Sequence, residues 1–103
     1  MTVGTAGKRS AIGVHRVVLP DHVVHRGFAQ ETIVLNLRTG LYHGLNATAG
    51  HMLETITSSP SLDAAAEQLA REYAEPVDRL RQDLIGLVND LVERDLVELR
   101  LAA

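Results

Sequence analysis

Histidines are the residues of this chain whose type and spacing come nearest to a reactive site. All five lie in the first half, and His22 and His25 are three positions apart in an apolar run. Imidazole is a common metal ligand, but side chains three apart on a strand face opposite sides of it. No cysteine or carboxylate cluster completes a ligand set. His43 and His51 flank a predicted strand–helix junction and could meet there, although a packing or solvent-facing role is commoner. We therefore expect no metal and no cofactor.

Catalytic motifs are missing from the sequence. There is no nucleophile elbow, no zinc-protease motif, no P-loop and no dinucleotide fingerprint. The acids Asp78, Asp83 and Asp90 share a predicted helix with Arg79 and Arg94, an arrangement typical of a solvated face. We expect no catalytic residues, and interpret the chain as a binding module rather than an enzyme.

Composition sets the class of protein. The 103 residues are 46% hydrophobic and 22% charged, as in ordinary soluble single domains. Absence of cysteine excludes disulfides. Residues 1–13 contain no apolar signal-peptide core, and no run approaches the ~18 apolar residues of a membrane span. The sequence predicts a cytoplasmic protein with no membrane partner.

The segment from Thr32 to Asn46 predicts a β-hairpin that leads directly into a helix. Apolar and polar residues alternate over Thr32–Leu37, which is the two-residue period of a half-buried strand. Thr39-Gly40 supplies the turn and Leu41–Leu45 the returning strand, with Leu41, His43 and Leu45 on one side. Asn46 is placed to cap the following helix.

The whole pattern predicts an α+β domain over residues 14–103, preceded by a flexible tail over residues 1–13. We expect a three-stranded antiparallel sheet followed by three helices, similar to a winged helix-turn-helix. The expected strands are Val23–Arg26, Thr32–Leu37 and Leu41–Leu45, with further short strands at Val14–Leu19 and Val97–Leu101, and the expected helices are Ala47–Thr57, Leu62–Tyr73 and Val77–Arg94.

Two kinds of binding remain open from these patterns. A helix-turn-helix invites DNA binding, but residues 61–103 carry five arginines against ten acids, which disfavours contact with phosphates. The alternative is a peptide that adds as a strand to a free edge at Leu41–Leu45. A second apolar row on the last helix, containing Ile85, Val88 and Val92, could form the other wall of a groove or could pack against the sheet.

The run from Ile33 to Gly50 resembles the signature of PqqD-like proteins. A strand ends at Gly40, and an aromatic residue, Leu45-Asn46 and a helix start rich in small residues follow. Leu69–Tyr73 and Asp83–Val97 also fit, although Asp95 stands where the family usually has glycine. The resemblance covers about residues 20–99.

This resemblance implies a recognition element for ribosomally made, post-translationally modified peptides. Such proteins bind the leader of a precursor peptide and present it to a leader peptidase or modifying enzyme, and this chain looks most like the freestanding type from lasso-peptide pathways. The alternatives are a chaperone for a radical-SAM modifying enzyme and, less favoured, a winged-helix DNA-binding protein. Carried over by position, the peptide would lie between a strand and the last helix, with the binding residues Leu41, Tyr42, His43, Gly44, Leu45, Arg81, Asp83, Leu84, Ile85 and Val88.

Overall fold

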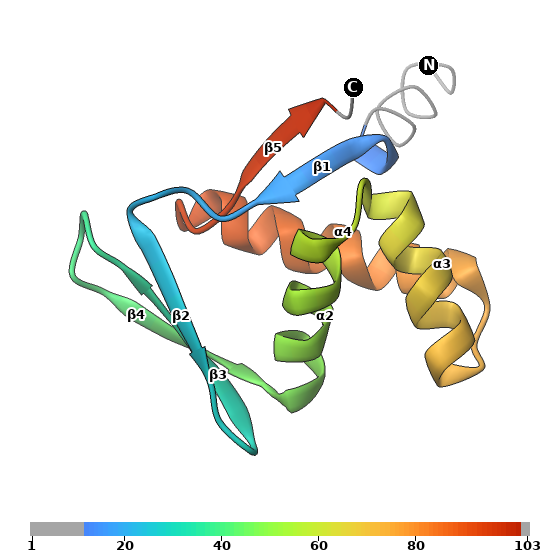
Figure 1. Ribbon diagram of the computed structural model, residues 1–103, viewed down its shortest axis with the longest axis horizontal. Helices are drawn as coiled ribbons and strands as arrows, with labels where there is room; N and C mark the ends of the chain where they lie inside the picture. The colour runs from blue at the N-terminus through green and yellow to red at the C-terminus, as the bar shows by residue number, and fades with distance from the viewer. Residues whose placement is uncertain (1–11, 102–103) are drawn as a thin grey trace.

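The structure, a computed structural model, describes residues 12–101 and has the expected α+β architecture (Figure 1). All strands and helices of the sequence prediction are present, with bounds shifted by one or two residues. In chain order they are β1 (His15–Val18), β2 (Val23–Gly27), β3 (Glu31–Asn36), β4 (Tyr42–Asn46), α2 (Ala47–Ser58), α3 (Leu62–Tyr73), α4 (Val77–Glu93) and β5 (Glu98–Leu101).

The prediction of a tail over residues 1–13 reaches two residues too far. Residues 1–11 lie outside the described part of the chain. Ile12 packs against the hydrophobic core, and the backbone of Gly13 lies so close to the carboxylate of Asp63 that a Cβ would collide with it. Within the described residues the fold therefore begins at Ile12 rather than at residue 14.

Strands β2, β3 and β4 form the expected antiparallel meander, with β3 in the centre. The register pairs Val34 with His25 on one side and with His43 on the other. β1 and β5 form a separate antiparallel ribbon in which Val17 lies opposite Leu99. The sequence predicted both segments as strands but gave no partner for either, because about 80 residues separate them and no local pattern encodes such a pairing.

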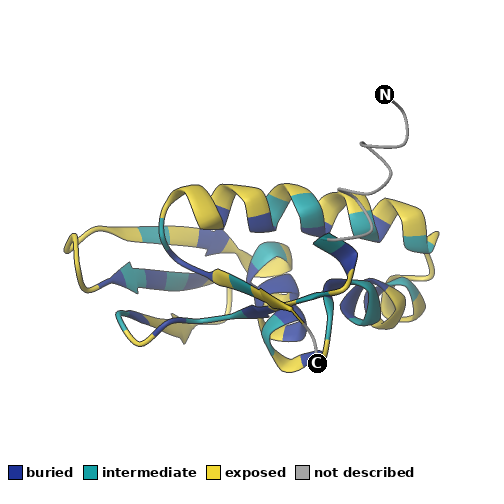
Figure 2. Ribbon diagram, turned by 90° about the horizontal axis from the view of Figure 1, so that it is seen from above, coloured by how far each residue is buried: buried dark blue, intermediate teal, exposed yellow. Residues whose placement is uncertain are grey.

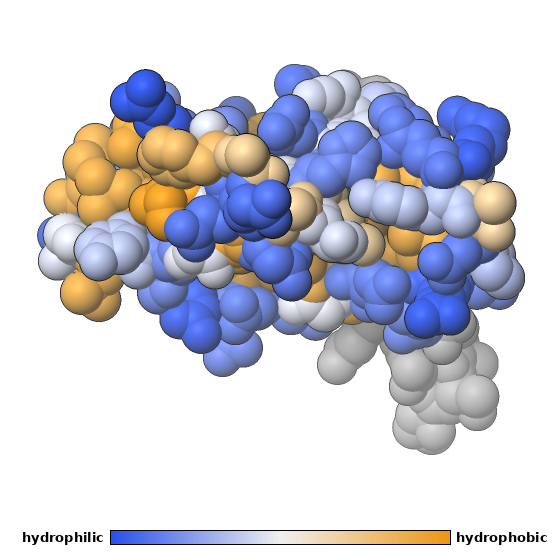
Figure 3. Space-filling model, turned by 90° about the horizontal axis from the view of Figure 1, so that it is seen from below, coloured by the Kyte–Doolittle hydropathy of each residue, from blue (hydrophilic) through white to orange (hydrophobic). Residues whose placement is uncertain are grey.

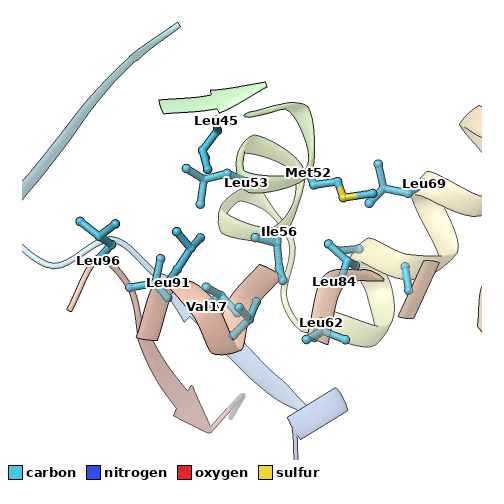
Figure 4. Close-up of a cluster of buried hydrophobic side chains, with 14 of the residues drawn as sticks. Val17, Leu45, Met52, Leu53, Ile56, Leu62, Leu69, Leu84, Leu91 and Leu96 are labelled. Atoms are coloured by element: carbon cyan, nitrogen blue, oxygen red, sulfur yellow. The ribbon is translucent and has the colours of Figure 1, made fainter. Parts of the chain in front are cut away.

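The hydrophobic core lies between the inner face of the meander, the ribbon and the three helices. α4 shows a buried stripe on one side and an exposed face on the other (Figure 2). Leucine and isoleucine side chains from every layer meet in this core (Figure 4). Each such side chain contributes roughly 1.5–3 kcal/mol when fully buried. The fully buried large side chains include Val17, Val34, Leu53, Ile56, Leu62, Leu69, Leu84, Val88, Leu91 and Leu96.

Local chemistry fixes where the elements begin and turn. Asn46 caps α2 as predicted, since its side-chain oxygen accepts a hydrogen bond from the Ala49 amide at 2.8 Å. Ser61 does the same for α3 through the Ala64 amide at 3.1 Å. Gly40 has a φ of 76° in the hairpin turn, a conformation that glycine adopts without strain. Within residues 12–101, no helix combines the length and apolar character needed to cross a membrane.

Candidate functional site

The outer edge of β4 is open, and its backbone groups alternate between two directions. On β3, the Leu37 amide donates to the His22 carbonyl near β2 at 2.7 Å, whereas the Asn36 amide donates to the Leu41 carbonyl near β4 at 2.9 Å. Antiparallel ladders alternate in this way along each strand. Because His43 lies opposite Val34, it directs its backbone groups toward β3, so Tyr42 and Gly44 direct theirs outward. Among the described residues, no strand pairs with that edge.

The C-terminal end of α4 lies beside this strand. The guanidinium of Arg94, directly after α4, is 3.1 Å from Nδ1 of His43, whose side chain is on the inner face of β4 (Figure 2). Arg94 also pairs with the Asp90 carboxylate at 3.2 Å. At about 100° per residue, Leu87, Asp90 and Asp83 fall within roughly 60° of Arg94 on one flank of the helix. That flank faces β4, and a shallow groove with one backbone wall and one side-chain wall results.

A buried polar contact holds the two walls together. The side chain of Asn36, at the end of β3, is 1% exposed and donates to the carbonyl oxygens of Arg94 at 3.3 Å and Asp95 at 3.2 Å. Its side-chain oxygen accepts from the backbone of Arg38 at 2.9 Å, within the hairpin turn. Asp95 adds ion pairs to His22 at 2.9 Å and to Arg38 at 3.2 Å. These contacts fix the β3–β4 hairpin against the end of α4.

The structure brings together only part of the residue set expected from sequence. Leu41, Tyr42, His43, Gly44 and Leu45 follow one another along the open strand, although Leu45 is almost fully buried and Leu41 precedes the strand. Of the α4 residues expected on the facing wall, Asp83 lies on the flank that faces β4.

The other four predicted α4 residues do not line this groove. Leu84 and Val88 have no exposed surface, so they support the helix from inside the core. Arg81 and Ile85 lie on the opposite flank, and Arg81 is also about 20 Å from Arg94 along the helix. The Arg81 guanidinium instead pairs with Asp63 at 2.8 Å, and that hydrogen bond raises the pKa of Arg81. For these four residues, the expected position on the facing wall is therefore corrected.

The sequence reasoning missed Leu87, Asp90 and Arg94. Leu87 was expected in the core stripe, and the two charged residues were interpreted as part of a solvated face. A helical wheel separates the two flanks of α4, but it does not say which flank lies against the sheet. That information comes from the long-range contacts of Asn36 and His43, for which the sequence gives no signal.

The histidines do not form a metal site within residues 12–101, where no group of three or more potential ligands converges. His22 contacts Asp95, while His43 contacts Arg94. His51 pairs with Glu72 across α2 and α3 at 2.9 Å and packs edge-on against Tyr73. The hydrogen bond from His51 holds the pKa of Glu72 below its ordinary value of 4.5. The possible meeting of His43 and His51 is not observed, since each has its own partner.

Comparison with known proteins gives a consistent result. The fold is similar to two solved structures, TbiB1 in complex with the TbiA(beta) leader peptide and lasso peptide synthetase B1 complexed with the leader peptide. Both have a TM-score of 0.72 and 23% sequence identity; the matches cover 79% and 81% of this chain and 94% and 98% of the solved chains, respectively. No curated protein matches the sequence. Residues 31–97 match the family model of coenzyme PQQ synthesis protein D (PqqD). This match spans both walls of the groove and well over half of the chain, and the chain therefore belongs to the PqqD family.

Proposed function

We propose that this chain binds the leader segment of a ribosomally synthesised precursor peptide and delivers it to a partner leader peptidase or modifying enzyme of lasso peptide biosynthesis. The open edge of β4 beside α4 is the observation that carries this proposal. Membership of the PqqD family supports it, as does the likeness of the fold to chains that are in complex with leader peptides.

The geometry explains how an extended peptide would be held. Tyr42 and Gly44 each offer an outward N–H and C=O, so a peptide strand would form up to four backbone hydrogen bonds. Each contributes on the order of 1 kcal/mol net. These bonds are independent of the peptide's sequence, and selectivity must come from its side chains.

Peptide side chains would alternate between two environments. A peptide residue opposite His43 would direct its side chain to the inner face, toward Arg94, Asp90 and Leu87. Its two neighbours would lie opposite Tyr42 and Gly44, with side chains on the outer face of the sheet. Gly44 has no side chain there, which leaves room beside it apart from the nearby Glu31 carboxylate. The groove therefore reads alternate residues of the leader.

Amide hydrogen exchange tests strand addition residue by residue. In the free chain, the Tyr42 and Gly44 amides should exchange rapidly, whereas the His43 amide is already bonded to β3 and should be protected. Adding the synthetic leader of the precursor encoded beside this gene should protect Tyr42 and Gly44 and leave His43 nearly unchanged. The β2 amide of His25, on the opposite edge, is the internal control. Leader binding without new protection at Tyr42 or Gly44 would contradict strand addition at β4.

A further inference from the structure

The outer face of the meander is apolar and uncovered. In the register, Val24 lies opposite Leu35, and Leu35 lies opposite Tyr42, so the three side chains form a row across the sheet on the face away from the helices. Val24 is 47% exposed and Tyr42 is 70% exposed. Hydrophobic side chains gather at this end of the molecule (Figure 3). Of the nine large hydrophobic side chains that are exposed in residues 12–101, five belong to this sheet and its turns: Val24, Phe28, Leu37, Leu41 and Tyr42.

A hollow of about 380 Å³ opens on this face and has a cationic rim. Its lining is mainly apolar and comprises Val24, His25, Arg26, Phe28, Ile33 and Leu35. The guanidinium of Arg26 lies 5.8 Å from the centre of the Phe28 ring, within the range of a cation–π contact. Within the described residues, no carboxylate forms an ion pair with Arg26. An arginine beside an aromatic ring and an apolar pocket is typical of the residues that dominate protein interfaces.

The shape and charge of this face favour a different protein over a second copy of the chain. In a symmetric dimer through this face, each hollow would meet a hollow, and the Arg26 side chains of the two copies would approach one another. The hollow instead fits a protruding apolar side chain, and the unpaired Arg26 fits a neighbouring carboxylate on the same partner.

The position of the face indicates which partner this is, if the proposed function holds. A peptide strand added to β4 would lie about 4.8 Å from that strand and would extend the same outer face past Tyr42. A protein docked on the hollow would then contact the chain and its bound leader together. We infer that the outer face of the β2–β3–β4 sheet is the docking surface for the enzyme that processes the bound peptide. That enzyme would insert an apolar side chain into the hollow and place a carboxylate against Arg26.

Matched substitutions at two exposed valines test this inference. Val24→Glu places a carboxylate at the hollow, whereas Val92→Glu makes the same change on α4 at a similar exposure, 41% against 47%. Arg26→Glu reverses the charge at the rim. The measurement is calorimetric titration of each variant, bound to synthetic leader, with the leader peptidase encoded beside the gene; circular dichroism verifies folding. Val24→Glu and Arg26→Glu should each weaken peptidase binding by about tenfold or more, whereas Val92→Glu should leave it within about twofold.

The leader titration separates this inference from the proposed function. All three variants should bind the leader within about twofold of the wild-type affinity, because their side chains lie away from the outward groups of β4. Normal leader binding with undiminished peptidase binding by Val24→Glu and Arg26→Glu would overturn the docking surface alone, as would absence of peptidase binding to the wild-type complex. A wild-type dimer that Val24→Glu converts to a monomer in light scattering would identify a second copy as the occupant and overturn it too. A wild-type chain that does not bind leader would overturn the proposed function itself.

Discussion

Single residues determine how the two walls of the groove meet. His43 has two separate roles, since its backbone belongs to the β3 ladder and its side chain receives Arg94. Asp95 follows α4 with a φ of 58°, the left-handed conformation for which glycine is the usual choice. Aspartate tolerates this conformation better than most residues, and here its carboxylate pairs with His22 and Arg38. The departure from the family's glycine thus supplies a contact between the hairpin and α4.

Arg94 should contribute to leader binding, whereas Arg79 on the same helix should not. Arg94→Ala removes the cation nearest the peptide residue opposite His43, and Arg79→Ala removes a more exposed arginine about 22 Å away along α4. We expect leader affinity to fall about three- to tenfold for Arg94→Ala, since a half-exposed charge contributes roughly 0.6–1.4 kcal/mol.

Fluorescence anisotropy of labelled leader measures both variants under the same conditions. The loss for Arg94→Ala should shrink as salt is raised, because the contact is partly screened. Equal affinities for the two variants would show that the flank of α4 next to β4 takes no part in binding.

At the scale of elements, the sequence predicts far more of the fold than of the site. Alternation in Thr32–Leu37, the Gly40 turn and the caps at Asn46 and Ser61 are local signals, and all of them give the observed hairpin and helices. The rotation of α4 about its axis is not local. It depends on where the Asn36 side chain meets the end of that helix, so the sequence could not separate the flank of Arg81 from that of Arg94.

The direction of each β4 backbone group leads to opposite outcomes for proline at adjacent positions. Tyr42→Pro removes an outward N–H at the first residue of an edge strand, where proline is tolerated. Leader affinity should fall about five- to tenfold relative to Tyr42→Ala, which keeps the N–H and loses the ring. His43→Pro removes a donor to β3 and should lower the midpoint of thermal unfolding.

Thermal unfolding by circular dichroism and leader titration together distinguish these outcomes. A Tyr42→Pro variant that is folded and binds leader as tightly as Tyr42→Ala would mean that the outward amide of Tyr42 is not used. A His43→Pro variant with unchanged stability would contradict the assignment of inward and outward groups on β4.

At the scale of the whole molecule, charge distinguishes a peptide-binding role from the winged-helix DNA alternative. The chain has a net charge of −3. The helix that would enter the major groove is α4, and it carries Asp78, Asp83, Asp90 and Glu93 against Arg79 and Arg81. Both arginines already pair with carboxylates, at 3.2 Å for Arg79 and 2.8 Å for Arg81. Neutralising DNA phosphates requires several available cations on one surface, and this helix offers none that is unpaired.

The chain should therefore not bind duplex DNA in moderate salt. Non-specific DNA binders have dissociation constants of roughly 1–100 µM that strengthen steeply as salt is lowered. Labelled random duplex, titrated with the chain up to about 100 µM, should show no change in anisotropy under conditions that saturate such binders. A variant in which Asp83 and Asp90 are both replaced by lysine supplies the matched control, because it reverses the charge of α4 on the flank next to β4. Only that variant should show salt-sensitive binding, and it should lose leader affinity if the same flank holds the peptide. A salt-sensitive shift with the wild-type chain would instead restore the DNA-binding interpretation, since it would require a cationic surface that neither α4 nor its flanks provide.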